Sequence, residues 1–206
     1  MKSTVARCPW PTVDDPLYLK YHDEEWGVPV HNDCKIYEFL VLEAFQAGLS
    51  WRTVLYKRKA FRKAFAGFDV RGVARFGARE ILRLLNNAAI IRNRQKILAA
   101  INNANRFLEV QQEWGTFATY MWSWVGHQPL IHRFRTLKDC PPYTDDAVVW
   151  AKDLKRRGFS FLGPTVVYAH MQAVGMVNDH TMNCFRYRLL AGGSRMRGYE
   201  TACAAK

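Results

Sequence analysis

Apolar residues recur at helical spacing along almost the whole chain, and the alternation typical of strands is nearly absent. In DCKIYEFLVLEAFQAG, for example, Ile36, Phe39 and Leu40 fall on one helical face, with Asp33 placed as its N-cap. Ser50 is placed as the N-cap of the next helix, SWRTVLYKRKAFRKAF. Further helices are predicted over AREILRLLNN, RNRQKILAAINNANRFLEV, TFATYMWSWV, DDAVVWAKDLKRRG and GPTVVYAHMQAVG. With about eight helices and short connections, the predicted fold class is all-α.

No internal repeat or low-complexity linker divides the chain, so residues 1–187 are predicted to form one domain with two lobes that share a groove. The longest non-helical connection is expected between residues 126 and 144. Residues 188–206 are basic and lack periodicity, and we expect a flexible tail there.

The charge balance favours a polyanionic partner. A formal net charge of +12 and a pI near 9.7 are typical of proteins that bind nucleic acid. Five cysteines, an odd number, without a secretory signal predict a reduced, cytoplasmic setting, with association to the nucleoid through DNA. No window approaches the roughly 18 apolar residues of a membrane span, so no membrane partner is expected.

The stretch KRRGFSFLGPT has the pattern of two helices joined by a tight turn. The first helix is expected to end at Gly158, and Gly163, Pro164 and Thr165 open the next. Free backbone N–H groups at such a helix start suit a phosphate, and the preceding Lys-Arg-Arg run adds positive charge. This turn therefore either grips a DNA backbone or is an ordinary corner between helices.

A second stretch, YLKYHDEEWGVP, concentrates aromatic and acidic residues. It contains Tyr21 and Trp26; Trp10 lies upstream, and Glu43 and Trp51 follow downstream. Each aromatic alone could be core filling. Grouped beside a carboxylate, they describe a pocket for a flat aromatic ligand, where stacking contributes about 1–3 kcal/mol per base and a cationic base gains more.

A third group contains metal-ligand residue types. His180 and Cys184 lie four residues apart, which places them on one face if the segment is helical, and Cys8 and His22 lie near the N-terminus. Two cysteines and two histidines make a tetrahedral zinc set, but this split spacing is not that of a zinc finger. The alternative is that all four are buried core residues.

Taken together, these motifs resemble the constitutive 3-methyladenine DNA glycosylase family of the helix-hairpin-helix superfamily. The matching stretches run from about residue 7 to 184: RCPW, DPLYLKYHDEEWGVP, LEAFQAGLSW, IIRNRQKI, HQP, KRRGFSFLGPT and MQAVGMVNDHTMNC. The resemblance implies a helix-hairpin-helix glycosylase fold with its hairpin over residues 157–165. It implies DNA contacts at Arg157, Gly158, Gly163 and Thr165.

The resemblance also implies the base pocket. Glu43 and Tyr21 match the catalytic and hydrogen-bonding groups, Trp51 the stacking residue, and Trp10 and Trp26 further walls. The residue that fills the gap left by a flipped base is expected in the turn Ala47–Gly48–Leu49 after the Glu43 helix, with Gly48 and Leu49 as DNA contacts.

One structural Zn²⁺ is implied at Cys8, His22, His180 and Cys184, which would staple the N- and C-terminal regions together. Where sister enzymes carry a catalytic aspartate, this chain has Asn178, and no lysine is placed as a Schiff-base nucleophile. The resemblance therefore implies a monofunctional enzyme without lyase activity. Because 3-methyladenine leaves from a cation, little acid–base help is needed, and we expect an ionised Glu43 to select that cation.

The predicted function is hydrolytic release of 3-methyladenine from alkylated double-stranded DNA in base excision repair, by a monomer that needs no obligate protein partner. One alternative is a catalytically inactive, zinc-containing DNA-binding relative. Another is a hydrolase that uses zinc-bound water, although a set of four side-chain ligands leaves no position for that water. Cys34, Cys140 and Cys203 are left without a role.

Overall fold

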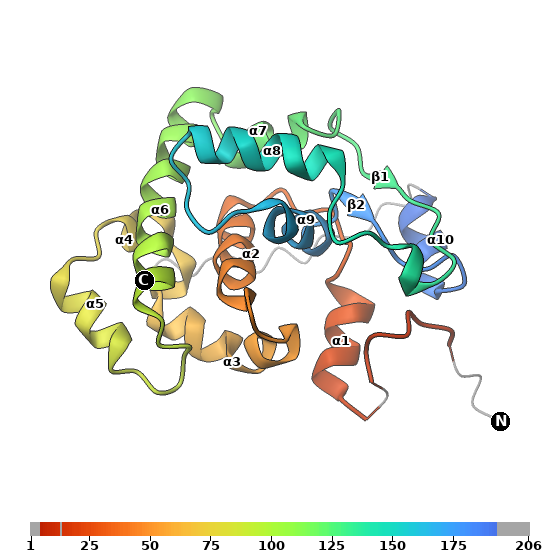
Figure 1. Ribbon diagram of the computed structural model, residues 1–206, viewed down its shortest axis with the longest axis horizontal. Helices are drawn as coiled ribbons and strands as arrows, with labels where there is room; N and C mark the ends of the chain where they lie inside the picture. Colours follow the sequence, from red (N-terminus) through yellow and green to blue (C-terminus); the bar gives the residue numbers. More distant parts are fainter. Residues whose placement is uncertain (1–4, 13, 193–206) are drawn as a thin grey trace.

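The computed structural model describes residues 5–12 and 14–192, and in this part of the chain nearly all regular structure is helical (Figure 1). The helices are α1 Pro16–Glu24, α2 Asp33–Gln46, α3 Trp51–Ala64, α4 Val70–Ala74, α5 Ala78–Leu85, α6 Arg94–Trp114, α7 Phe117–Ser123, α8 Asp145–Arg156, α9 Pro164–Ala173 and α10 Phe185–Ala191, with short 3-10 turns η1 Ala66–Phe68 and η2 Leu137–Asp139. The all-α prediction is confirmed, with ten α-helices rather than about eight in the described ranges. None of the described helices is long and apolar enough to cross a bilayer.

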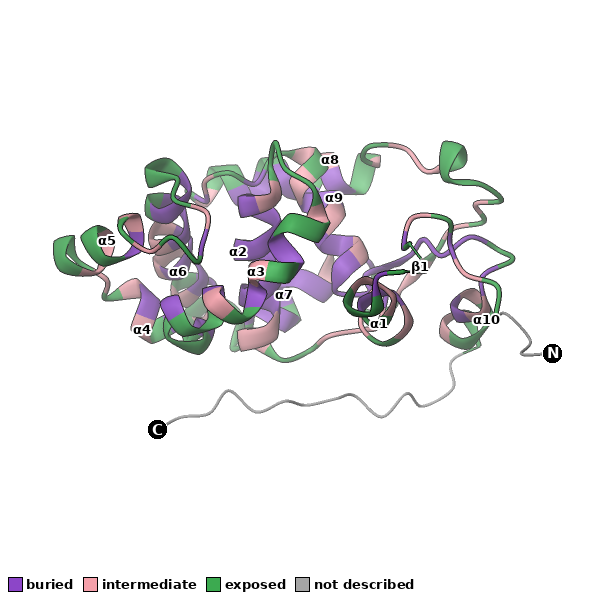
Figure 2. Ribbon diagram, turned by 90° about the horizontal axis from the view of Figure 1, so that it is seen from below, coloured by how far each residue is buried: buried purple, intermediate pink, exposed green. Residues whose placement is uncertain are grey.

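Helix α2 is the centre of the molecule (Figures 1 and 2). Every residue from Ile36 to Phe45 is buried, including Glu38 and Glu43. A helix that is buried on all sides needs neighbours all round, and α2 contacts α3, α6, α7 and α9. The buried apolar side chains form one continuous cluster, which runs along the chain from Tyr21 in α1 to Val177 in β2.

The predicted N-cap of α2 is wrong by one residue. Asn32 caps the helix, accepting a hydrogen bond from the backbone N of Lys35 at 3.0 Å, and Asp33 is the first helical residue. The Asp33 carboxylate instead accepts hydrogen bonds from the backbone N–H groups of Phe117 and Ala118, both at 2.9 Å. It thus caps the start of α7, because tertiary packing brings the first N–H groups of that helix to the Asp33 carboxylate.

Segments from the N-terminal and the C-terminal parts of the described chain meet beside a minimal parallel sheet. Strand β1, Leu130–Ile131, pairs with β2, Val177–Asn178. Gly175, just before β2, has φ +72°, and a Cβ there would lie 2.4 Å from the carbonyl carbon of Val28. Only glycine allows the N-terminal and C-terminal segments to approach this closely.

The predicted tail begins too early. Helix α10 extends to Ala191, so residues 188–191 are helical. Its short length and lack of clear periodicity hid it from pattern analysis. Residues 193–206, which carry the rest of the predicted tail and Cys203, lie outside the described part of the chain.

Candidate base-binding pocket and metal cluster

A cavity of about 300 Å³ opens between α1, α2, the start of α3, α9 and the segment after β1. It contains all five residues predicted to form the base pocket. Its lining consists of Trp10, Tyr18, Tyr21, Trp26, Glu43, Gln46, Trp51, Phe134, Thr136, Leu137, Cys140, Ala169, Gln172, Asp179 and Thr181. This size and mixture of aromatic and polar groups suit a small flat ligand.

Two of the aromatic side chains of the pocket, Tyr21 on α1 and Trp51 on α3, lie on helices, whereas Trp10 and Trp26 lie in the segments before and after α1. Trp51 is the first residue of α3, whose start is fixed by the predicted cap: Ser50 accepts from the backbone N of Thr53 at 3.2 Å. Its ring lies 5.2 Å from that of Tyr21, centroid to centroid. Trp10 and Trp26 meet edge to face at 5.1 Å. The walls are therefore set by packing before any ligand enters.

Glu43 is the buried carboxyl of this pocket, with 4 % of its surface exposed. Burial raises its pKa to about 8, and the charge of Arg58 offsets only part of this rise. Arg58 is committed elsewhere, because it donates to Glu38 at 2.7 Å and to Glu25 at 2.9 Å. In the pocket without a cation, this raised pKa favours the protonated carboxyl at pH 7, which differs from the ionised Glu43 expected from the sequence.

Tyr21 is equally suited to donate a hydrogen bond. Burial, with the nearby Glu43 as a second cause, raises its pKa well above its usual value. The phenol therefore stays neutral at any physiological pH. Together, Tyr21 and Glu43 give the cavity two hydrogen-bonding groups, of which only Glu43 has a pKa near physiological pH.

Asp179 is a pocket residue that the sequence did not single out. Its side chain is fully buried and accepts hydrogen bonds from His132 Nδ1 at 2.6 Å, Tyr168 Oη at 2.5 Å and Gln172 Nε2 at 2.7 Å. Its neighbour Asn178 is absent from the cavity wall: its amide donates to the carbonyl of Tyr187 at 3.1 Å. The partners of Asp179 come from α9 and from the segment after β1. The local sequence around Asp179 therefore does not show that it lines the cavity.

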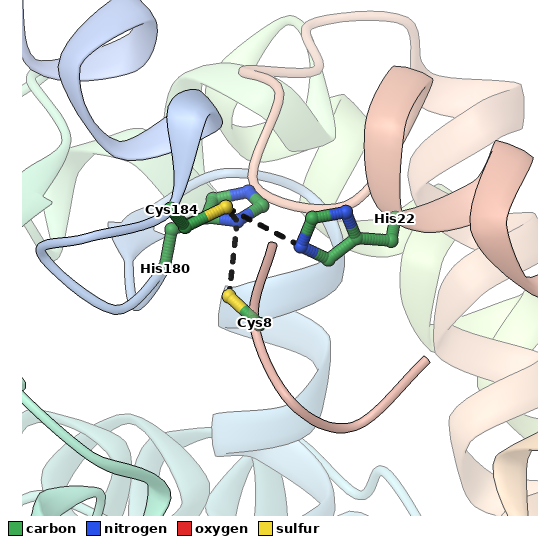
Figure 3. Close-up of side chains that lie close together, drawn as sticks. All are labelled: Cys8, His22, His180 and Cys184. Carbon is green, nitrogen blue, oxygen red and sulfur yellow. Dashed lines mark hydrogen bonds between the residues drawn. The ribbon is translucent and has the colours of Figure 1, made fainter. Parts of the chain in front are cut away.

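The four predicted metal ligands converge in a buried cluster beside the pocket (Figure 3). Cys8 and His22 come from the N-terminal region, whereas His180 and Cys184 come from the segment between β2 and α10. Their candidate ligand atoms all lie within 4.8 Å of one another. The set is brought together across about the full length of the described chain, as the family resemblance implies and the spacing alone does not.

Hydrogen bonds orient both imidazoles of the cluster. His22 Nδ1 lies 2.7 Å from Asp23 Oδ1, and Arg7 in turn donates to Asp23 at 2.7 Å. His180 Nε2 lies 3.0 Å from the carbonyl oxygen of Trp26. The other nitrogen of each ring, His22 Nε2 and His180 Nδ1, faces the cysteines. Such outer partners fix the tautomer of a ligating histidine.

The predicted hairpin is formed by α8 and α9 and the turn between them. Gly158, which follows the α8 cap, has φ +86°, and Gly163 caps α9 with Pro164 as its first residue. Gly163 and Thr165 are exposed. The Arg157 side chain is half-buried and bonded to Glu113 at 2.6 Å and Asp153 at 2.8 Å. In this structure, therefore, Arg157 braces the hairpin rather than offering a free cation.

The turn between α2 and α3 projects next to the pocket. Leu49 is 44 % exposed despite its apolar side chain, and Gly48 is exposed beside it. Lys96 on α6 fixes the base of the turn by donating to the carbonyls of Phe45 at 3.0 Å and Ala47 at 2.5 Å. An exposed leucine on a braced turn has the form expected of a wedge.

Comparison with known proteins agrees with this geometry. The sequence pattern of the methyladenine glycosylase family matches residues 10–187. DNA-3-methyladenine glycosylase 1 of Escherichia coli K12 is 45 % identical over 183 residues, covering 89 % of this chain and 97 % of its own. A crystal structure of 3-methyladenine DNA glycosylase I is 46 % identical, with a TM-score of 0.85 over 87 % of this chain and 98 % of its own.

A further crystal structure is a tyrosine-to-phenylalanine variant of 3-methyladenine DNA glycosylase I in complex with 3-methyladenine. It is 36 % identical, with a TM-score of 0.83 over 86 % of this chain and 95 % of its own. Pattern, identity and fold agree over nearly the whole described chain. The chain belongs to the methyladenine glycosylase family.

Proposed function

We propose that this chain is a monofunctional DNA glycosylase that hydrolytically releases 3-methyladenine from alkylated double-stranded DNA. The observation that carries the proposal is the buried Glu43 carboxyl in a cavity walled by Trp51, Tyr21 and further aromatic rings. The family relatives named for this activity, one of them bound to 3-methyladenine, support the same substrate.

Selection of the lesion follows from the electrostatics of Glu43. A 3-methylated adenine in DNA carries a positive charge, whereas ordinary adenine does not. When the cation enters, its field favours the ionised carboxylate, so Glu43 releases its proton to solvent water and a buried ion pair forms. A neutral adenine meets a neutral carboxyl and gains no such pair. Stacking on Trp51 adds about 1–3 kcal/mol to either base.

The reaction then needs little chemical assistance. Cleavage of the glycosidic bond converts the cationic base to a neutral leaving group, so no strong general acid is required. Tyr21 and Glu43 hold the base while water attacks the sugar, and base flipping costs only a few kcal/mol. Among the described residues that line the cavity there is no lysine to act as a Schiff-base nucleophile, so the proposal includes no lyase step.

Contacts to the DNA backbone offset the cost of flipping. We assign phosphate contacts to the exposed start of α9, at Gly163 and Thr165, and to the backbone near Gly158. Gly48 and Leu49 fill the space in the base stack. The chain acts as a monomer in this scheme, because every proposed group comes from one copy.

The metal cluster fits one structural Zn²⁺ held by Cys8, His22, His180 and Cys184. With Zn–S near 2.3 Å and Zn–N near 2.0–2.1 Å, a tetrahedral site separates S and N by about 3.5 Å. The cluster has Cys8 Sγ to His180 Nδ1 at 3.5 Å, Cys184 Sγ to His180 Nδ1 at 3.5 Å, and Cys184 Sγ to His22 Nε2 at 3.6 Å. Four side chains close the coordination, so the ion supplies structure and no activated water.

The proposal is tested by incubating the protein with alkylated duplex DNA and identifying the released base. We expect free 3-methyladenine without strand cleavage. Tight binding to DNA without any release would favour an inactive relative, and strand cleavage would contradict the monofunctional mechanism. Dependence of the chemical step on the identity of a substituted metal would favour a zinc-water hydrolase.

Glu43→Gln separates lesion recognition from general DNA binding. The amide cannot form the ion pair with a cationic base, so we expect binding to lesion-containing DNA to fall by tenfold or more, on the order of 1.4 kcal/mol. Binding to undamaged DNA should stay within about twofold. Equal losses on both duplexes, measured side by side, would argue against the pocket assignment.

A further inference from the structure

Residues 132–140, here called the rim segment, follow β1 directly and include the 3-10 turn η2. Four of its residues line the pocket: Phe134, Thr136, Leu137 and Cys140. Most of the segment is nevertheless exposed, as the colours between β1 and α8 show in Figure 2. The rim segment is therefore one wall of the cavity and also part of the outer surface at its mouth.

The side chains of the rim segment divide between these two surfaces. Phe134 and Thr136 line the cavity, while the residues beside them, Arg133 and Arg135, are exposed. Lys138 adds a third exposed cation. The only acid of the segment, Asp139, is used locally, accepting from the backbone N of Arg135 at 2.9 Å and of Thr136 at 2.8 Å.

Arg133 and Arg135 differ in their partners from two arginines of α3, Arg52 and Arg62, which are both in ion pairs. Arg52 is mostly exposed yet pairs with Asp15 at 2.7 Å, and Arg62 pairs with Glu38 at 2.6 Å. Among the described residues, no ion pair or side-chain hydrogen bond involves the guanidinium of Arg133 or Arg135. Arg133 and Arg135, neither of them in an ion pair, thus lie on either side of a pocket-lining phenylalanine in the sequence, and Arg135 is also within electrostatic range of Asp139.

The rim segment is also firmly attached to the molecule. The backbone N of His132 donates to the carbonyl of Asn178 at 3.3 Å, and the backbone N of Met182 donates to that of Phe134 at 2.8 Å. His132 Nδ1 bonds to Asp179 at 2.6 Å. Three ties at the start of the segment set the positions of Arg133 and Arg135 without help from their own side chains.

We propose that the rim segment is a second DNA-backbone contact, in which Arg133 and Arg135 bind phosphates next to the flipped nucleotide. The inference rests on the proposed function, because a base in the cavity stays linked to its sugar and to two phosphates outside the mouth. Cations at the rim lie within one nucleotide of those phosphates. They neutralise charge there, while the Gly163 and Thr165 backbone contacts on α9 are a separate site.

The test is the salt dependence of binding to a short duplex that carries one stable abasic-site analogue, which stands for the flipped nucleotide and needs no catalysis. Each lost phosphate contact reduces the slope of log K against log salt by about 0.9. We expect the double variant Arg133→Ala, Arg135→Ala to lose about one to two from that slope. Arg133→Lys, Arg135→Lys should keep most of it, because the charge remains.

The matched control is Arg75→Ala, Arg79→Ala. These arginines are equally exposed and unpaired among the described residues, but they lie at α4 and α5, at the opposite end of the molecule from β1 (Figure 1). The control should leave the slope unchanged. An unchanged slope in the rim variant, or an equal decrease in the control, would overturn the proposal.

A second measurement separates this proposal from the proposed function. Binding of free 3-methyladenine, followed by quenching of tryptophan fluorescence, should be unchanged in the rim variant because Phe134 and Thr136 remain. Loss of free-base binding would mean that the substitutions distort the wall, which would overturn a pure backbone contact. Failure of the unaltered protein to release 3-methyladenine would overturn the function and leave the salt result standing.

Discussion

At the scale of single residues, burial of the Glu43 carboxyl makes the stability of the folded chain depend on pH. Its pKa is about 8 in the folded chain because of burial, against 4.5 for an ordinary glutamate. A raised pKa means that the folded state keeps a proton that the unfolded state releases. The contribution of Glu43 to stability is therefore complete below about pH 4.5 and is lost as the pH rises through 8.

Glu43→Gln should remove this pH dependence. From pH 5 to pH 8, we expect the parent to lose a few kcal/mol of its free energy of unfolding relative to the variant, which has no carboxyl to ionise. Urea unfolding at both pH values, without base or DNA, measures it. Glu109→Gln, which changes an exposed carboxylate, serves as control. Parallel pH profiles for Glu43→Gln and its parent would show that the carboxyl is ionised in the empty pocket.

At the scale of elements, Asp33 joins two helices that are far apart in sequence. Its carboxylate accepts from the N–H groups of Phe117 and Ala118 at the start of α7, and from Gln111 Nε2 at 2.6 Å. Asp33→Ala should lower the free energy of unfolding by about 1–3 kcal/mol, because helix-end donors lose a charged acceptor. If urea unfolding shows a loss of only a few tenths of a kcal/mol in the free energy of unfolding, Asp33 acts merely as a negative charge in the first turn of α2.

The same residue shows how far the sequence could predict the fold. Helical spacing predicted most helices, and Ser50 was identified correctly as a cap because capping is a local pattern. Asp33 was misassigned, since its partners lie 84 and 85 residues away. The pocket followed the same rule. The aromatic and acidic motifs were visible in the sequence, but Asp179 and the rim segment join the cavity only through tertiary packing.

At the scale of the whole molecule, the metal cluster connects the N-terminal and C-terminal regions of the described chain. Residues 5–12 form no helix or strand. The Trp10 ring packs against Tyr18, Tyr21, His22 and Trp26, the backbone N of Phe185 donates to the carbonyl of Ala6 at 2.9 Å, and Arg7 bonds to Asp23. Cys8, two residues before Trp10, adds the contact with His180 and Cys184. The edge of this pocket wall therefore depends on ligands from both the N-terminal and the C-terminal region.

Loss of the metal should accordingly loosen the pocket edge without unfolding the central helices. Metal analysis of protein purified without chelator should give about one zinc per chain, and Cys184→Ser should reduce it severalfold. Structural zinc contributes on the order of 10 kcal/mol in small zinc peptides. Here the large core around α2 remains, so we expect a lowered melting temperature and faster hydrogen exchange confined to α1 and the His180 region. Cys140→Ser, which changes a free thiol outside the cluster, should keep its zinc. A parent protein with well under one zinc, or equal metal loss in both variants, would refute the staple.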